Sequence, residues 1–190
     1  MIVAVDFDNI LNNLTEKTLE IYNAQSGKTI QMSNLKSYNF YDCLSKADAD
    51  GIIKLFKKKE LWDILTPIEG SRDGLQKLID AGHRVFIVTA TAPENFLWKI
   101  QFLRKYFPFF NTDNVVRMMD KSLFKCDIMI EDSYEQLIKN KLCHKIIFDY
   151  PWNADEPKDW VYGTYRCKNW TEIVDAVNKI QDEVNGWIGK

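Results

Sequence analysis

Two acidic residues stand two positions apart at the end of an apolar, strand-like run near the N-terminus. The run IVAVDF (2–7) carries Asp6, and Asp8 follows after a single phenylalanine. Side chains two positions apart in an extended chain lie on the same side, and buried like charges are unfavourable unless a cation compensates them. One such carboxylate could attack an electrophile while the other transfers the proton of the leaving group.

Three later strand-like runs also lead into candidate residues. The second run ends in Thr89, Ala90 and Thr91, Lys121 follows the third, and the fourth ends in Glu131 and Asp132. Ligands of open α/β sheets bind at the carboxyl ends of the strands. Mg²⁺ prefers carboxylate oxygens and often pairs with substrate phosphate, and a hydroxyl and a lysine can hold phosphoryl oxygens. The pattern therefore favours a magnesium-assisted phosphoryl site.

Short apolar runs predict the strands, and amphipathic runs between them predict helices. The strand-like runs cover 2–7, 84–90, 115–118, 127–132, 145–150 and 160–165. Helical spacing covers 72–81, 93–106 and 172–186, with Ser71 and Thr171 as expected N-caps. Strands that are apolar on both faces and alternate with helices predict an α/β fold with a doubly wound, mostly parallel, Rossmann-like sheet.

The interval between the first two strands is longer than a crossover needs. A parallel crossover takes about a dozen residues, and the helix expected at 72–81 already provides it. Residues 12–66 are surplus, and they carry helical patterns around an aromatic cluster, SYNFYDC. We therefore expect a core of residues 1–11 and 67–190, with a small helical cap of residues 12–66 inserted after the first strand.

Composition narrows the class of protein. The chain has 190 residues, 46% of them hydrophobic, and a net charge of −2, which argues against binding to a nucleic-acid polymer or a membrane surface. We find no run long enough to span a bilayer and no leader-like segment at the start. Four cysteines without CxxC pairing suit a reducing cytoplasm, where we expect the protein.

Four short motifs in order resemble a known superfamily. DFDN, IVTAT, DK and IEDS match the motif set of the haloacid dehalogenase superfamily of phosphatases over roughly residues 1–150. The expected helical cap, the segment LTPIEGSRDGLQKL and the spacing DKSLFKCDIMIEDS resemble the 5'(3')-deoxyribonucleotidase family within it. The ordered set is much more specific than any one motif.

The resemblance implies a role for each motif residue. Asp6 would be the nucleophile that forms an aspartyl-phosphate, and Asp8 the general acid and base. Thr89 would bind the phosphoryl group, and Lys121 would neutralise phosphate and nucleophile.

The resemblance also implies a Mg²⁺ site. Asp6 and Asp132 would be direct ligands, Asp8 would contribute its backbone carbonyl, and Glu131 would hold a coordinating water.

Substrate contacts are less clearly indicated. Phe40, Tyr41 and Trp62 could stack a nucleobase or form the core that a helical cap needs, and both interpretations stay open. Ala90 and Thr91 are the candidate contacts beside the phosphoryl site.

The chain departs from the family pattern at three positions, namely Asn9 for the usual Gly, Ala90 for a hydroxyl residue and Leu14 for an aromatic residue. Asn tolerates left-handed backbone, so the turn can persist. These departures bear on substrate choice more than on catalysis.

The main hypothesis is a Mg²⁺-dependent phosphomonoesterase that hydrolyses (deoxy)nucleoside monophosphates. An alternative keeps the chemistry but takes a sugar phosphate or another small phosphometabolite. A third hypothesis, an inactive phosphatase-like binding module, has less weight because none of the expected acids is missing. The expected partner is a small nucleotide, with a homodimer left open.

Overall fold

The computed structural model describes residues 1–155 and 164–188. Within them a single sheet carries its strands in the order β3-β2-β1-β4-β5-β6, and every neighbouring pair is parallel. The strands are β1 (Ile2–Val5), β2 (Arg84–Thr89), β3 (Val115–Arg117), β4 (Ile128–Glu131), β5 (His144–Phe148) and β6 (Thr164–Cys167). This confirms the predicted α/β class and parallel sheet. Residues 160–163 of the sixth predicted run lie outside the described residues.

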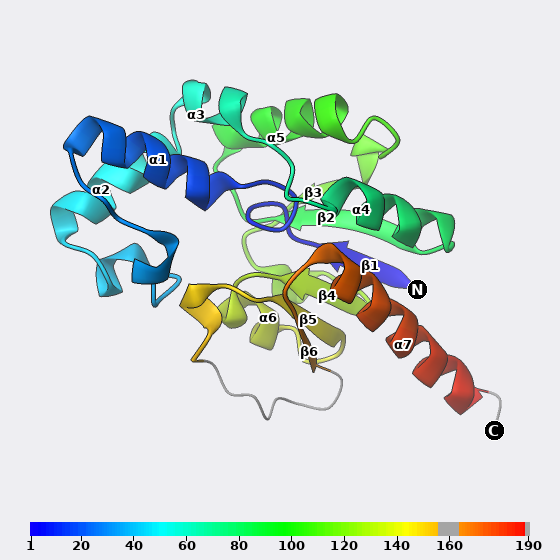
Figure 1. The fold of residues 1–190 in the computed structure, drawn as a ribbon. Coiled ribbons are helices and arrows are strands. Elements are labelled where there is room, and N and C mark those ends of the chain that lie inside the picture. The colour runs from blue at the N-terminus through cyan, green and yellow to red at the C-terminus, as the bar shows by residue number, and fades with distance from the viewer. Residues whose placement is uncertain (156–163, 189–190) are drawn as a thin grey trace.

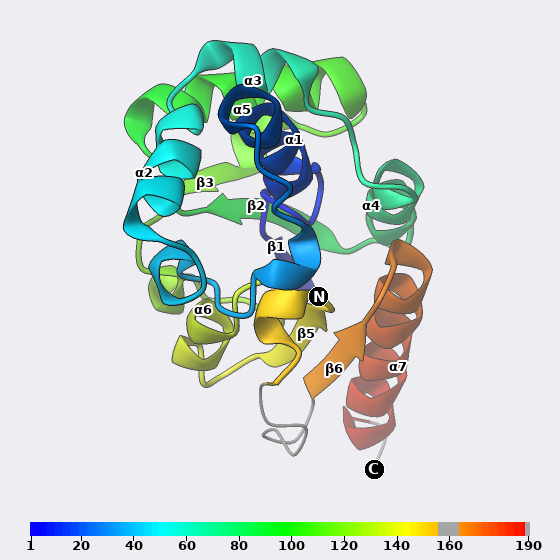
Figure 2. The same cartoon turned by 60° about the vertical axis from the view of Figure 1, so that its left-hand side comes forward.

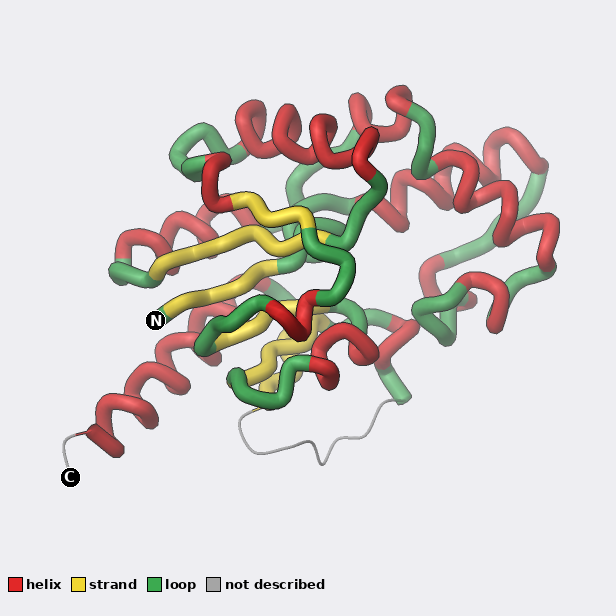
Figure 3. Tube along the Cα trace, turned by 180° about the vertical axis from the view of Figure 1, so that it is seen from behind, coloured by secondary structure: helices red, strands yellow, loops and turns green. Residues whose placement is uncertain are grey.

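Helices cover both faces of the sheet (Figures 1 and 3). Successive side chains of a strand point to opposite faces, so Val3 and Val5 join the core under α4 (Ser71–Asp80), α5 (Pro93–Tyr106) and α7 (Trp170–Ile188). Ala4 belongs to the core on the other face, under α6 (Tyr134–Lys139). Strands buried on both faces explain the nearly continuous apolar runs. No helix in the described part of the chain has the length and hydrophobicity to cross a membrane.

Helix α4 packs against α7 at a position where only glycine fits. A Cβ on Gly74 would lie 2.3 Å from the Cε3 atom of the Trp170 ring, and real Cβ atoms do not approach other atoms so closely. The indole fills this space and donates from Nε1 to the carbonyl of Ile10 at 2.8 Å. The contact therefore ties the C-terminal helix to the segment that follows β1.

Both helix-capping predictions are wrong by one or two residues. Helix α4 is preceded by Gly70 at φ 75°, while Ser71 is inside the helix with its hydroxyl 3.4 Å from the Leu11 carbonyl. At the start of α7, Asn169 accepts from the backbone N–H of Glu172 at 2.9 Å, so this residue caps the helix in place of Thr171.

All the helices and turns of regular structure between β1 and α4 are α-helical or 3₁₀. It contains α1 (Leu14–Ser26), the 3₁₀ turns η1 (Met32–Asn34) and η2 (Phe40–Asp42), α2 (Lys46–Leu55) and α3 (Lys59–Ile64). Figures 1 and 2 show α1, α2 and α3 grouped beyond one end of the sheet, opposite the end at which β1 begins.

The chain leaves and re-enters the sheet region side by side. Asn12 forms an antiparallel bridge with Pro67, and the Asn13 N–H donates to the Thr66 carbonyl at 3.2 Å. These contacts lie at the boundaries expected for the cap. The division into a core of residues 1–11 and 67–190 and a cap of residues 12–66 stays a prediction.

Candidate active site

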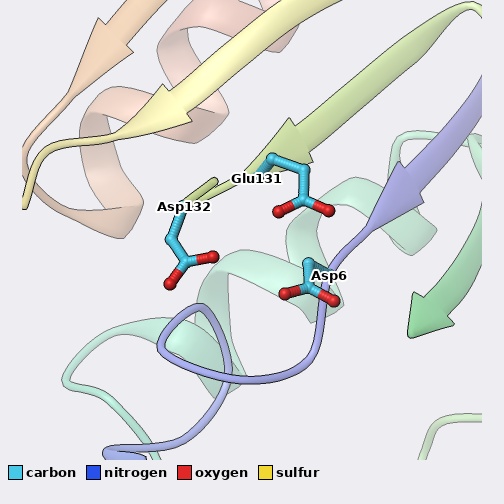
Figure 4. A group of neighbouring side chains, drawn as sticks. All are labelled: Asp6, Glu131 and Asp132. Atoms are coloured by element: carbon cyan, nitrogen blue, oxygen red, sulfur yellow. The ribbon is translucent and has the colours of Figure 1, made fainter. Parts of the chain in front are cut away.

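The carboxyl ends of β1 and β4 bring three buried acids together. Asp6 follows β1, Glu131 ends β4 and Asp132 follows it, and one carboxylate oxygen from each lies within 4.8 Å of the others (Figure 4). Strands β1 and β4 are neighbours in the sheet although the chain visits β2 and β3 between them. This reversal of strand order is where open α/β sheets bind ligands.

Lys121 is the cation of this cluster. It comes from the 3₁₀ turn η4 (Lys121–Leu123), and its ammonium lies 2.5 Å from Asp6 Oδ1 and also pairs with Glu131 Oε1. Burial opposes its charge, but the two carboxylates outweigh burial and hold the pKa of Lys121 above its ordinary value. Lys121 therefore stays protonated beside Asp6.

One lysine does not neutralise three carboxylates. Burial and the negative charge of Asp6 raise the pKa of Glu131 to about 7, and the same two causes raise the pKa of Asp132 well above its usual range. Asp132 Oδ1 is buried and has no hydrogen-bond partner among the described residues. A hard divalent cation would relieve both the repulsion and the unpaired oxygen, so the donor set fits such an ion.

Asp8 belongs to a second, adjoining network. Its Oδ2 pairs with the ammonium of Lys99, which also donates to Thr89 Oγ1 at 2.8 Å, and its Oδ1 accepts from Asn12 Nδ2 at 3.2 Å. The ammonium lies 4.9 Å from the centroid of the Phe7 ring, so it also makes a cation–π contact. The network links the predicted acid and base to the predicted phosphoryl-binding hydroxyl.

Lys99 was not found by sequence reasoning, although a signal was present. It shares the buried face of α5 with Asn95, Phe102 and Leu103, and its side chain is fully buried. Lysine is rarely buried without a partner. A lysine on the apolar face of the helix that directly follows the strand ending in Thr89 is therefore a signal for a functional residue.

Asn9 does more than support the turn. Its backbone is left-handed at φ 57°, as its tolerance of that region allows. Its side chain donates to Asp132 Oδ2 at 2.9 Å and accepts from the Thr15 N–H of α1 at 3.0 Å, while Tyr150 donates to its carbonyl at 2.8 Å. Asn9 thus connects one acid of the cluster to helix α1.

A cavity of about 270 Å³ adjoins these networks. Asp8 and Asn9 line it, and so do four of the five predicted substrate residues, namely Phe40, Trp62, Ala90 and Thr91. The fifth, Tyr41, is not among the lining residues; it is exposed and donates from its hydroxyl to Asp50 at 2.7 Å.

Three further aromatic residues line the cavity, namely Tyr38, Phe56 and Trp152. Half of the Tyr38 surface is exposed, yet burial of its hydroxyl and the negative charges of Asp132 and Asp6 raise the pKa of Tyr38 well above its ordinary value. Trp152 donates from Nε1 to the Asp132 carbonyl at 3.1 Å. Residue type alone did not distinguish these rings from Tyr41.

A known family matches almost the whole chain. The sequence model described as "5' nucleotidase, deoxy (Pyrimidine), cytosolic type C protein" matches residues 1–182. A 5'(3')-deoxyribonucleotidase of Bacillus subtilis (strain 168) is 27% identical over 174 residues, covering 90% of this chain and 95% of the relative. A 5'(3')-deoxyribonucleotidase of Clostridium acetobutylicum is 23% identical over 172 residues, covering 88% and 94%.

Solved structures share the fold. A haloacid dehalogenase-like hydrolase from Streptococcus pneumoniae aligns with a TM-score of 0.62 at 12% identity, over 93% of this chain and 97% of that one. A HAD-hydrolase from Bacillus subtilis, solved with bound magnesium, aligns with a TM-score of 0.59 at 12% identity, over 93% and 98%. At these identities the likeness shows the architecture, which is that of haloacid dehalogenase-like hydrolases.

Proposed function

This chain belongs to the 5' nucleotidase, deoxy (pyrimidine), cytosolic type C family, and we propose that it is a Mg²⁺-dependent phosphomonoesterase acting on deoxyribonucleoside monophosphates in the cytosol. Family membership makes it a nucleotidase-type hydrolase. One observation carries the finer proposal. Two ion pairs, Asp6 with Lys121 and Asp8 with Lys99, lie beside an aromatic cavity at one edge of the sheet.

In the proposed reaction Asp6 is the nucleophile. Its carboxylate attacks phosphorus, the ester bond breaks, and an aspartyl-phosphate forms while Asp8 donates a proton to the leaving oxygen. Asp8 then takes a proton from the water that attacks the same phosphorus, which releases phosphate and restores Asp6. Lys121, at 2.5 Å from Asp6, offsets negative charge during both steps.

Lys99 and Thr89 support this chemistry from the other side. Lys99 donates to one carboxylate oxygen of Asp8 and Asn12 donates to the other oxygen. These two donors fix the orientation of the Asp8 carboxyl group. Thr89 accepts from Lys99, so its own hydroxyl proton is available to a phosphoryl oxygen.

For the metal we propose Mg²⁺, held by Asp6, Asp132 and the Asp8 carbonyl, with Glu131 acting through water. The support is the cluster of three carboxylates, the unpaired Asp132 oxygen and the magnesium bound by a hydrolase of the same fold. When bound, the ion would offset charge on the phosphoryl oxygens.

The cavity supports a nucleotide over a smaller phosphate ester. Its walls carry Phe40 and Trp62, whose ring faces suit a planar base, and its polar side is at Asp8. A sugar phosphate has no planar base to stack on these rings.

A substrate panel with Mg²⁺ tests the proposal. We expect kcat/KM for thymidine 5′-monophosphate to exceed that for glucose 6-phosphate by at least about tenfold, and the Asp6→Asn variant to release no phosphate. Asp182→Asn, an exposed change on α7, serves as the matched control. Equal rates on both substrates would refute the nucleotide assignment, and an active Asp6→Asn variant would refute the mechanism.

A further inference from the structure

Asn95 carries an unpaired polar atom on the wall of the cavity. Its side-chain oxygen is buried and has no hydrogen-bond partner among the described residues. The residue is only 7% exposed and lines the cavity. Leaving a buried acceptor unpaired is unfavourable. A ligand in the cavity that donates a hydrogen bond to this oxygen would remove that cost.

The position of Asn95 shows which part of a ligand could supply that donor. Asn95 is four residues before Lys99 on α5, and residues four apart lie on the same helix face, one turn from each other. Lys99 contacts Asp8 and Thr89, where the phosphoryl group is proposed to react. Asn95 is therefore one turn away from the phosphoryl end of the cavity.

The chemistry of the surrounding walls narrows the donor further. The segment between β1 and α4 lines the cavity with Phe40, Phe56 and Trp62, and the Trp62 ring lies beside α5, 6.0 Å from the Trp98 ring between centroids. Just before α5, Ala90 and Ala92 line the cavity without a polar side-chain atom, and Thr91 lines it with a hydroxyl. In a nucleotide with its phosphate at Asp8 and its base among the rings, the sugar joins the two, and Asn95 is the lining residue whose buried side-chain oxygen lacks a partner among the described residues.

The geometry points to Asn95 as a residue that recognises the free hydroxyl of the substrate's sugar, an inference that rests on the proposed function. In a deoxyribonucleoside 5′-monophosphate this is the 3′-hydroxyl. The hydroxyl would donate to the Asn95 amide oxygen, and because a hydroxyl both donates and accepts, it suits either orientation of the amide. Asn95 thereby favours substrates whose sugar carries this hydroxyl over analogues that lack it.

A pair of substrates that differ only in this hydroxyl provides the test. The measured quantity is the ratio of kcat/KM for thymidine 5′-monophosphate to kcat/KM for its 3′-deoxy analogue, with Mg²⁺ present. We expect a ratio of about ten in the wild type, as one hydrogen bond of ordinary strength gives. In Asn95→Leu, which keeps the volume and removes the acceptor, the ratio should fall to about one.

Two further variants serve as a repeat and as a control for this test. Asn95→Ala repeats it with a smaller side chain in case leucine disturbs folding, and Gln101→Leu, an exposed change on the same helix, should keep the wild-type ratio. A wild-type ratio near one, or an unchanged ratio in folded Asn95 variants, would overturn the inference while leaving the proposed function standing. A wild type that hydrolyses neither nucleotide would refute the proposed function and this inference with it.

Discussion

Replacing Lys99 with methionine separates its role in activity from its role in stability. The ammonium is fully buried, pairs with Asp8, donates to Thr89 at 2.8 Å and lies over the Phe7 ring. Methionine keeps a similar length and removes the charge and the donors. The variant therefore leaves Asp8 without the cation that holds it.

The size of the effect on kcat follows from the hydrogen bonds that are lost. A hydrogen bond to a charged group contributes about 1.5–3 kcal/mol, and Lys99 donates both to the Asp8 carboxylate and to Thr89. We therefore expect a loss of about 2–3 kcal/mol in transition-state stabilisation, equivalent to a fall in kcat of roughly 30- to 150-fold. The free energy of unfolding should fall by less than the roughly 3–5 kcal/mol expected for a fully buried pair, because the Asp8 side chain is 24% exposed and methionine packs well against aromatic rings.

The assay is steady-state release of phosphate from thymidine 5′-monophosphate, with thermal unfolding measured on the same samples. Lys105→Met, an exposed change on α5, is the matched control and should leave kcat unchanged. A Lys99→Met variant that folds normally and keeps kcat within threefold of the wild type would refute the reasoning about Asp8.

Three other predictions concern the turn, a buried histidine and a helix contact. Asn9→Gly keeps the left-handed turn but loses the hydrogen bond to Asp132. The Mg²⁺ concentration that gives half-maximal activity should therefore rise about tenfold or more, and an unchanged concentration would contradict this prediction. Burial, aided by the positive N-terminus, lowers the pKa of His83 below 6.5 in the folded state. The unfolded chain then binds more protons, so the free energy of unfolding should fall as the pH drops below about 6.5, by at most about 1.4 kcal/mol per pH unit. Urea denaturation of His83→Leu should show a shallower dependence of this free energy on pH, and an equally steep one would exclude His83 as the cause. Gly74→Ala places a Cβ 2.3 Å from the Trp170 ring and should cost about 1–3 kcal/mol in the same assay, whereas a stability equal to wild type would show that the contact can relax.

Much of the fold could be predicted because its signals are local. Each strand of a parallel sheet buried on both faces is a short apolar run, and polar residues directly after such runs must lie at one edge. Asp6, Glu131 and Asp132 meet for this reason. The family resemblance then indicated roles that periodicity alone does not show.

The parts that sequence reasoning missed depend on tertiary contacts. Lys99 lies on an apolar helix face, and only the fold shows that Asp8 and Thr89 meet it there. Tyr38 lies in irregular backbone and Tyr41 in the single short turn η2, neither of which has a helical or strand period, so the sequence could not tell which ring lines the cavity. Irregular backbone breaks the rule that relates spacing to direction.

The Asn9 side chain is a further example. Its residue type indicated tolerance of a left-handed turn, which the structure shows at φ 57°. Its contacts with Asp132 and Thr15 join residues far apart in the sequence or in separate elements, and no local pattern indicates them.

The central claim is that Asp6 attacks phosphorus, and the most direct measurement is to trap the phosphorylated enzyme. The wild type is mixed with thymidine 5′-monophosphate and Mg²⁺, quenched in acid within one turnover, digested and analysed by mass spectrometry. The account predicts one added phosphoryl group on the peptide that contains Asp6, and none in the Asp6→Asn variant. A phosphoryl group on another residue, or full turnover by Asp6→Asn, would contradict it.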